Sequence, residues 1–93
     1  MSVRVMSMVW EASPSKGAAR LVLLALADAA ADTGEVGGRL VSQEMLAWRC
    51  RLSRRAVQRA LDRLEAEGEL RRIVHGDGRT PSRYQLCVGG AAR

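Results

Sequence analysis

The sequence predicts an α+β domain that is mainly α-helical, with a three-helix core and a C-terminal β-hairpin. Two observations support this fold class: apolar residues recur at helical spacing in segments before Gly68, and the pattern changes to period two after it. The 93 residues, 47% of them apolar and 27% charged, suffice for one modest core. We expect the domain to span residues 13–88, between an apolar arm at 1–12 and a flexible C-terminus at 89–93.

The N-terminal half is expected to supply the arm and the central helix. Residues 1–12 are too apolar for a free tail, but they fit neither the helical nor the strand period. Packing on the domain's own core is one interpretation; a dimer contact is the other, because Trp and Met are enriched at interfaces. The first long helix should follow Ser13-Pro14-Ser15, with Ser13 or Ser15 as its cap. Its core residues are expected to be Leu21, Val22, Leu24, Ala25, Leu26 and Ala29.

A glycine-containing stretch separates this helix from the next one. Residues 32–38 read as a loop by composition. Residues 39–41 are expected to form a short extra strand before the second helix. That helix starts after the capping residue Ser42 and has an apolar patch formed by Met45, Leu46 and Trp48.

The longest amphipathic segment is a helix predicted over residues 54–67. Ser53 is suited to cap its start, and Gly68 is suited to a left-handed C-terminal cap. On a helical wheel one stripe is apolar and the opposite stripe is polar. The apolar stripe contains Val57, Ala60, Leu61 and Leu64, and the polar stripe contains Arg55, Gln58, Arg59 and Asp62, with Arg54 at the leading end.

The polar stripe carries side chains that can recognise nucleic acid. Arginine binds guanine edges or phosphate through two parallel hydrogen bonds, and glutamine can pair with an adenine edge. For an isolated helix, a solvated arginine-rich surface would be the simpler interpretation. Here only residues 50–53 separate the helix from the preceding one, so the two helices must cross sharply. This is the helix-turn-helix layout, in which the second helix enters the major groove of DNA.

The C-terminal pattern predicts a β-hairpin. Residues 69–75 and 83–88 alternate as strands do, and the polar turn 76–82 joins them. A hairpin directly after the recognition helix corresponds to the wing of a winged helix. We expect Arg79 at its tip to reach phosphate or the minor groove, supported by Arg71, Arg72 or Arg83. A plain surface hairpin is the alternative.

The distribution of charge agrees with this assignment. The net charge is +5, and residues 49–83 carry ten arginines against five acidic residues. Residues 1–48 carry four basic and five acidic residues, so the positive excess lies in the helix-turn-helix and hairpin segments.

Several classes of function find little support in the composition. No apolar run approaches ~20 residues and no signal-peptide layout is present, so we expect no membrane contact and a cytoplasmic, nucleoid-associated protein. Cys50, Cys87 and His75 lack a fourth ligand for zinc, and Asp28 and Asp32 lack a third ligand for a metal ion. With one histidine and no clustered carboxylates, we expect no enzyme activity, no cofactor and no small-molecule ligand.

The same motifs resemble a known family. Four segments are similar to winged helix-turn-helix domains of phage, plasmid and actinobacterial regulatory or replication-associated proteins. They are LVLLALADAAADTGEV, Met45-Leu46-Ala47 after Ser42, LSRRAVQRALDRLEAEGEL and RRIVHGDGRTPSRYQL. The resemblance covers about residues 10–88 and implies DNA as the ligand. Many of these domains have Pro-Ser at the second helix's cap, where this chain has Val41-Ser42. The candidate DNA-binding residues are Ser42, Gln43, Ser53, Arg54, Arg55, Gln58, Arg59, Arg63 and Arg79.

Three functions fit these features. The first is a sequence-specific double-stranded DNA-binding protein that regulates transcription, as a homodimer on a repeated site. The second is an accessory factor in replication initiation or recombination. The third is a winged helix that contacts an acidic protein partner instead of DNA.

Overall fold

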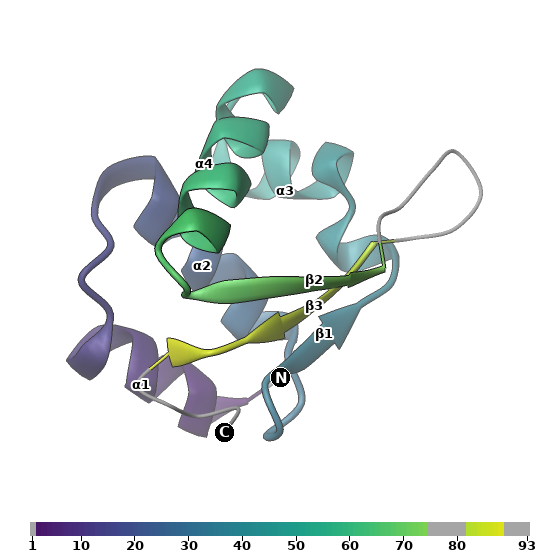
Figure 1. Cartoon of the computed structure of the whole chain (residues 1–93). Coiled ribbons are helices and arrows are strands. Elements are labelled where there is room, and N and C mark those ends of the chain that lie inside the picture. Colours follow the sequence, from purple (N-terminus) through teal and green to yellow (C-terminus); the bar gives the residue numbers. More distant parts are fainter. Residues whose placement is uncertain (1, 75–81, 89–93) are drawn as a thin grey trace.

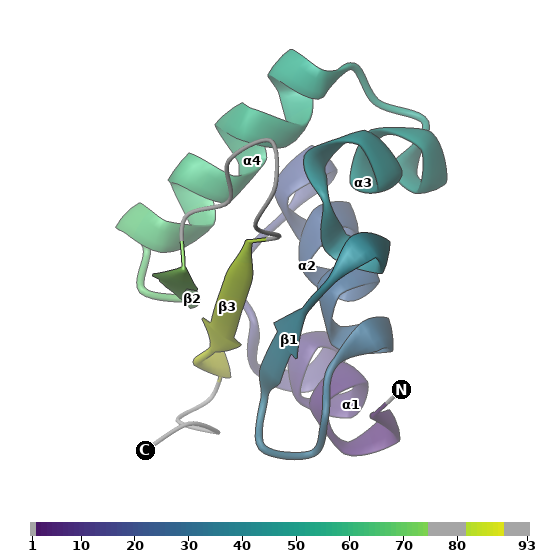
Figure 2. The same ribbon diagram turned by 90° about the vertical axis from the view of Figure 1, so that its right-hand side faces the viewer.

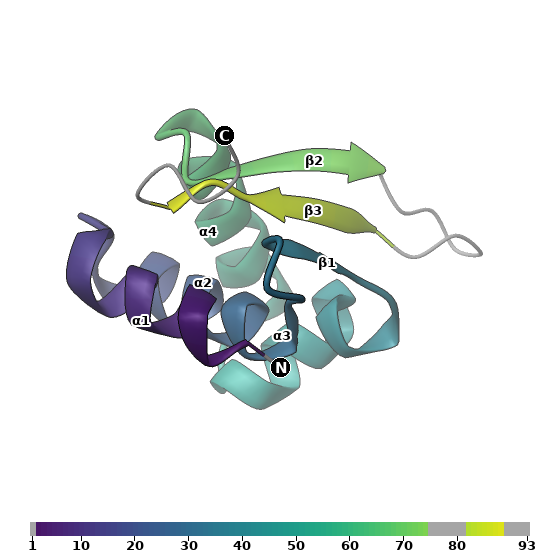
Figure 3. The same cartoon turned by 90° about the horizontal axis from the view of Figure 1, so that it is seen from below.

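The chain folds with its helices on one side and a small antiparallel sheet on the other (Figures 1 and 3). This computed structural model describes residues 2–74 and 82–88. In chain order, the elements are α1 (Val3–Ala12), α2 (Gly17–Ala29), β1 (Glu35–Gly37), the 3₁₀ turn η1 (Arg39–Val41), α3 (Gln43–Cys50), α4 (Arg54–Ala66), β2 (Leu70–Val74) and β3 (Arg83–Leu86). The predicted fold class, a mainly helical winged helix-turn-helix domain, is confirmed.

Residues 3–12 form a regular helix, so the expectation that this segment fits no helical period is wrong. Ser2 caps α1: its Oγ accepts a hydrogen bond from the Val5 N–H at 3.1 Å and donates one to Asp32 Oδ1 at 2.7 Å. Val5 and Val9, one turn apart, are fully buried and pack into the common core. Because Met and Val also occupy the other faces of α1, the sequence pattern does not reveal this narrow apolar stripe.

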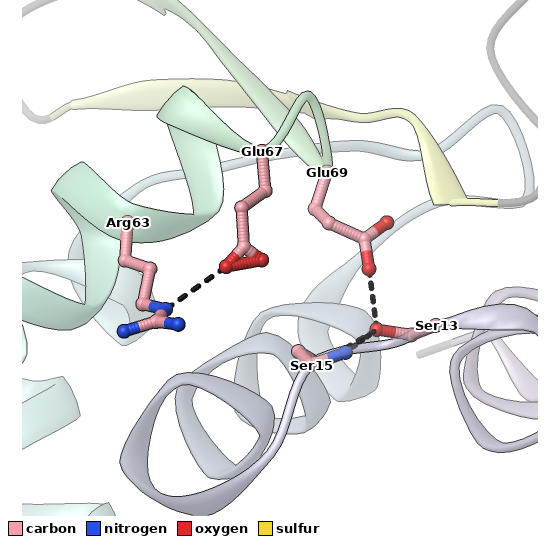
Figure 4. A network of polar contacts seen from close by, with 5 residues as sticks. All are labelled: Ser13, Ser15, Arg63, Glu67 and Glu69. Carbon is pink, nitrogen blue, oxygen red and sulfur yellow. Dashed lines mark hydrogen bonds and ion pairs between the residues drawn. The ribbon is translucent and has the colours of Figure 1, made fainter.

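Helix α2 is the central core helix, as predicted, but its start and its buried face differ from the prediction. The helix begins at Gly17, and Lys16 occupies the cap position without a side-chain hydrogen bond. Ser13 and Ser15 instead hydrogen-bond to each other, and Ser13 donates to the carboxylate of Glu69, which is only 6% exposed (Figure 4). A buried carboxylate needs hydrogen-bond partners. Because the serines are engaged in these bonds, they do not cap α2.

The buried face of α2 also includes a residue that the prediction omitted. Leu23 is fully buried beside Val22 and Leu26, whereas Leu21, expected in the core, is 43% exposed. The run from Leu21 to Leu26 is apolar on all sides, so its sequence period could not orient it.

The first strand lies earlier than expected. Residues 35–37, predicted as part of a loop, form β1, and residues 39–41, predicted as a strand, form η1. In the sheet order β1-β3-β2, Val36 of β1 pairs with Tyr84 of β3. Gly38, with φ of +93°, turns the chain out of the sheet before η1 begins.

The hairpin strands form as predicted, with shorter bounds. Leu70 of β2 pairs with Leu86 of β3, and the predicted alternation of Tyr84, Leu86 and Val88 onto one buried face is confirmed. The predicted tip, including Arg79, falls mostly within residues 75–81, which lie outside the described residues.

The acidic residues considered as metal ligands have other partners. Asp28 accepts a hydrogen bond from Arg49 at 2.8 Å, and Asp32 accepts from Ser2. The described ranges contain no group of three histidine, cysteine, aspartate or glutamate side chains placed to hold a metal ion, and His75 lies outside them. Within the same ranges, none of the helices has the length and apolar character needed to span a bilayer.

The packing of α1 can be tested with two valines on the same helix. Val9→Ala should lower the free energy of unfolding by about 2 kcal/mol, because two buried methyl groups are lost and a cavity remains. Val3→Ala is the matched control: Val3 is 74% exposed, so its loss should change stability by less than about 0.5 kcal/mol. Urea denaturation measures both, and equal small effects would show that α1 does not stabilise the domain.

The two cysteines should differ in reactivity. Burial raises the pKa of the Cys50 thiol, an effect that the neighbouring Arg49 charge partly offsets. Because the thiolate is the reactive form, Cys50 should stay protonated and react with a disulfide reagent at pH 8 more slowly than the partly exposed Cys87. The variants Cys50→Ala and Cys87→Ala separate the two rates. Similar rates in the folded protein would contradict the burial of Cys50.

Candidate nucleic-acid interface

Helix α4 presents one buried face and one open face, as its sequence predicts. The Ser53 Oγ accepts from the Ala56 N–H at 3.0 Å, and Gly68, with φ of +76°, follows the last turn. All members of the predicted apolar stripe are buried, and all members of the polar stripe are exposed. The rest of the described chain therefore leaves the polar stripe uncovered.

Helix α3 precedes α4 through a tight turn. Ser42 caps α3 by accepting from the Met45 N–H at 3.1 Å. Arg51, with φ of +57°, ends the helix in the left-handed conformation, and its N–H bonds back to the last turn. The chain therefore reverses within three residues, and the two helices cross as Figure 2 shows.

One side chain of the predicted α3 patch lies outside the core. Leu46 is buried and Met45 is partly buried, but Trp48 is 73% exposed. The short helix has room for few residues against the core, and Leu46 and Cys50, one turn apart, occupy that side.

The starts of α3 and α4 are joined at the surface by two glutamines. Gln58 Nε2 donates to Gln43 Oε1 at 3.0 Å. The bond leaves the Gln43 amide group free to donate and the Gln58 carbonyl free to accept. Both residues were predicted to face DNA, and the structure brings them together.

The acidic side chains on one flank of α4 are paired with an arginine of the sheet. Arg72 of β2 donates to Asp62 Oδ1 at 2.7 Å, and its Nε lies 3.5 Å from Glu65 Oε1 without hydrogen-bond geometry. Arg83 likewise pairs with Glu35. These contacts give Arg72 and Arg83, which we expected to support the wing, a role within the protein.

The arginines at the start of α4 differ from Arg72 and Arg83 in their contacts with the described residues. Within residues 2–74 and 82–88, Arg54, Arg55 and Arg59 form no ion pair, and all three are exposed. Arg63 donates through Nε to Glu67 Oε1 at 2.9 Å (Figure 4), and its side chain is 68% exposed. The free cations thus gather on one part of the helix.

Eight of the nine candidate residues lie on α3, α4 or their caps, and Arg79 lies outside the described residues. A hollow of about 370 Å³ beside them, between the start of α2 and α4, includes a residue that the sequence analysis did not select, Lys16. The sequence gives no reason to assign a single lysine before an apolar helix to the DNA-binding residues. Only the fold places Lys16 beside Arg55 and Arg59.

Comparisons with known proteins support the assignment of α3 and α4 as a helix-turn-helix pair. A family model described as a helix-turn-helix domain matches residues 16–68, more than half of the chain. The match covers α2 to α4 and ends before the hairpin. No curated protein and no solved structure matches the chain. Helix-turn-helix domains are DNA-binding modules, so the match supports DNA as a partner.

The pairing of Arg72 can be separated from direct DNA contact by a double-mutant cycle. If the polar stripe of α4 binds DNA, Arg72→Ala should weaken duplex binding by roughly 1 kcal/mol, about fivefold, because it leaves two carboxylates unpaired beside the stripe. In an Asp62→Asn, Glu65→Gln background, the effect of Arg72→Ala should largely disappear. Fluorescence anisotropy measures the affinities. An undiminished effect of Arg72→Ala in that background would mean that Arg72 contacts DNA.

Proposed function

Because the chain belongs to the helix-turn-helix domain family, we propose that it is a sequence-specific double-stranded DNA-binding protein that regulates transcription as a homodimer. The observation that carries the proposal is the open face of α4. There Arg55, Gln58 and Arg59 lie exposed on a helix whose opposite face is fixed in the core. A rigid helix with free hydrogen-bonding side chains is what readout of base edges requires.

In this proposal α4 enters the major groove from its N-terminal end. Arg55 pairs with a guanine edge or a phosphate, and Gln58 pairs with an adenine edge. The start of α3, with Ser42 and Gln43, lies across the sugar-phosphate backbone. The hydrogen bond between Gln43 and Gln58 holds the Gln58 amide in place before DNA arrives, which lowers the entropy cost of binding.

The hairpin is proposed to serve as the wing, with Arg79 on phosphate or in the minor groove. This part rests on the sequence pattern and on the antiparallel pairing of β2 with β3, the two strands that the predicted turn connects. Its contribution would be independent of sequence, because phosphate contacts position a protein without reading bases.

Selection of bound duplexes from a random pool tests the proposal. A recovered consensus supports sequence-specific binding, and a palindromic consensus supports a homodimer on two half-sites. Mapping the consensus to promoters, origins or attachment sites separates a transcriptional regulator from a replication or recombination factor. Absence of duplex binding at moderate salt would refute the proposal and favour a protein partner.

Substitutions should then divide the surface into base-reading and backbone-binding parts. Arg55→Ala or Gln58→Ala should each lose about 1–3 kcal/mol of discrimination at one base position. Arg79→Ala should weaken all sequences about equally. Affinities for a panel of single-base variants of the selected site measure both effects. Equal losses from all three substitutions on every site would contradict this division.

A further inference from the structure

The two flanks of α4 differ in charge. One flank faces β2 and carries Asp62 and Glu65, paired with Arg72. The other flank faces the start of α2 (Figure 1). It borders the hollow described above, which we call the α2–α4 hollow. Among the described residues, those with charged side chains that line this hollow are Lys16, Arg55, Arg59 and Arg63, and none of them is a carboxylate.

Small side chains let a ligand approach these cations closely. Alanines of both helices, Ala18 and Ala56 among them, form the apolar part of the hollow. Longer side chains at these positions would fill the space between the helices. The hollow is therefore an open site with an alanine floor and four basic side chains around it, of which Arg63 is ion-paired with Glu67.

The start of α2 adds to the positive potential of the hollow. Lys16, at the cap position, makes no side-chain cap hydrogen bond, and the hydroxyls of Ser13 and Ser15 are engaged with each other. The first-turn N–H groups of α2 thus lack a side-chain acceptor, and the helix dipole favours an anion there. This is a supporting feature; the cations from two helices define the site.

We propose that the α2–α4 hollow binds a backbone phosphate of the DNA, with Lys16 as a ligand outside the helix-turn-helix pair. The inference rests on the proposed function. Arg55 and Arg59 belong both to the hollow and to the DNA-facing stripe of α4. When α4 occupies the major groove, the backbone beside the groove runs along the flanks of the helix. On the α2 flank, Lys16, Arg55 and Arg59 form no ion pair with any described residue.

Salt dependence of duplex binding by the full chain tests the role of Lys16. Each phosphate contact adds about 0.9 to the slope of log K against log salt concentration. Lys16→Gln should weaken binding to all sequences about equally and reduce the slope by about 1. Arg4→Gln is the matched control. It removes one charge from α1, which lies away from the DNA-facing end of α4, and should leave the slope unchanged (Figures 1 and 2).

Phosphate-ethylation interference locates the contact. With the wild-type chain, we expect ethylation of a phosphate flanking the base positions read by α4 to block binding. With Lys16→Gln, interference at that phosphate should disappear while the other positions persist. Circular dichroism melting of both variants verifies that they remain folded.

Three outcomes would overturn the inference. An unchanged slope and interference pattern for Lys16→Gln, with sequence preference intact, would remove the phosphate site but leave the proposed function standing. Lys16-dependent binding of inorganic phosphate with no effect on DNA would indicate a small-anion site instead. A wild-type chain that binds no duplex would defeat the proposed function and this inference together.

Discussion

The apolar contact between α2 and α4 is the interaction on which the rest of the structure depends. Val57, Leu61 and Leu64 are fully buried on one side of α4, and Leu23 and Leu26 are fully buried on α2. Burial of each such side chain stabilises the fold by about 1.5–3 kcal/mol. Rotation of α4 by even one residue would expose part of this stripe, so the same contact that builds the core also fixes which side chains face outward.

The distribution of charge on the surface of α4 depends on which of its charged side chains have an ion-pair partner. Asp62 lies on the exposed stripe and would repel phosphate, but Arg72 of β2 compensates it. The sheet therefore contributes to the interface by cancelling negative charge, and the α2 side contributes positive charge. As a result, the positive charge that would attract DNA phosphates is concentrated toward the N-terminal half of α4 and the hollow beside it.

The sequence predicted the helix-turn-helix pair well because its signals are local. The caps at Ser42 and Ser53 and the stripe of α4 each depend on residues within one helix. The sequence could not predict features set by distant partners: Ser13 bonds Glu69 instead of capping α2, and β1 needs β3 to become a strand. Lys16 joined the candidate surface for the same reason, because its neighbours on α4 are about 40 residues away in the chain.

The number of free cations bears on the proposed homodimer. On α4 and in the hollow beside it, the described cations are Lys16, Arg54, Arg55, Arg59 and Arg63, and Arg63 is ion-paired with Glu67. Base readout uses some of them, so few remain for phosphate. Each phosphate contact adds to the affinity through counterion release, so a protein with few such contacts gains little affinity from this source. A second copy on a repeated site would double the contacts without any change in the fold, and the symmetry of the two half-sites would then reproduce that of the protein.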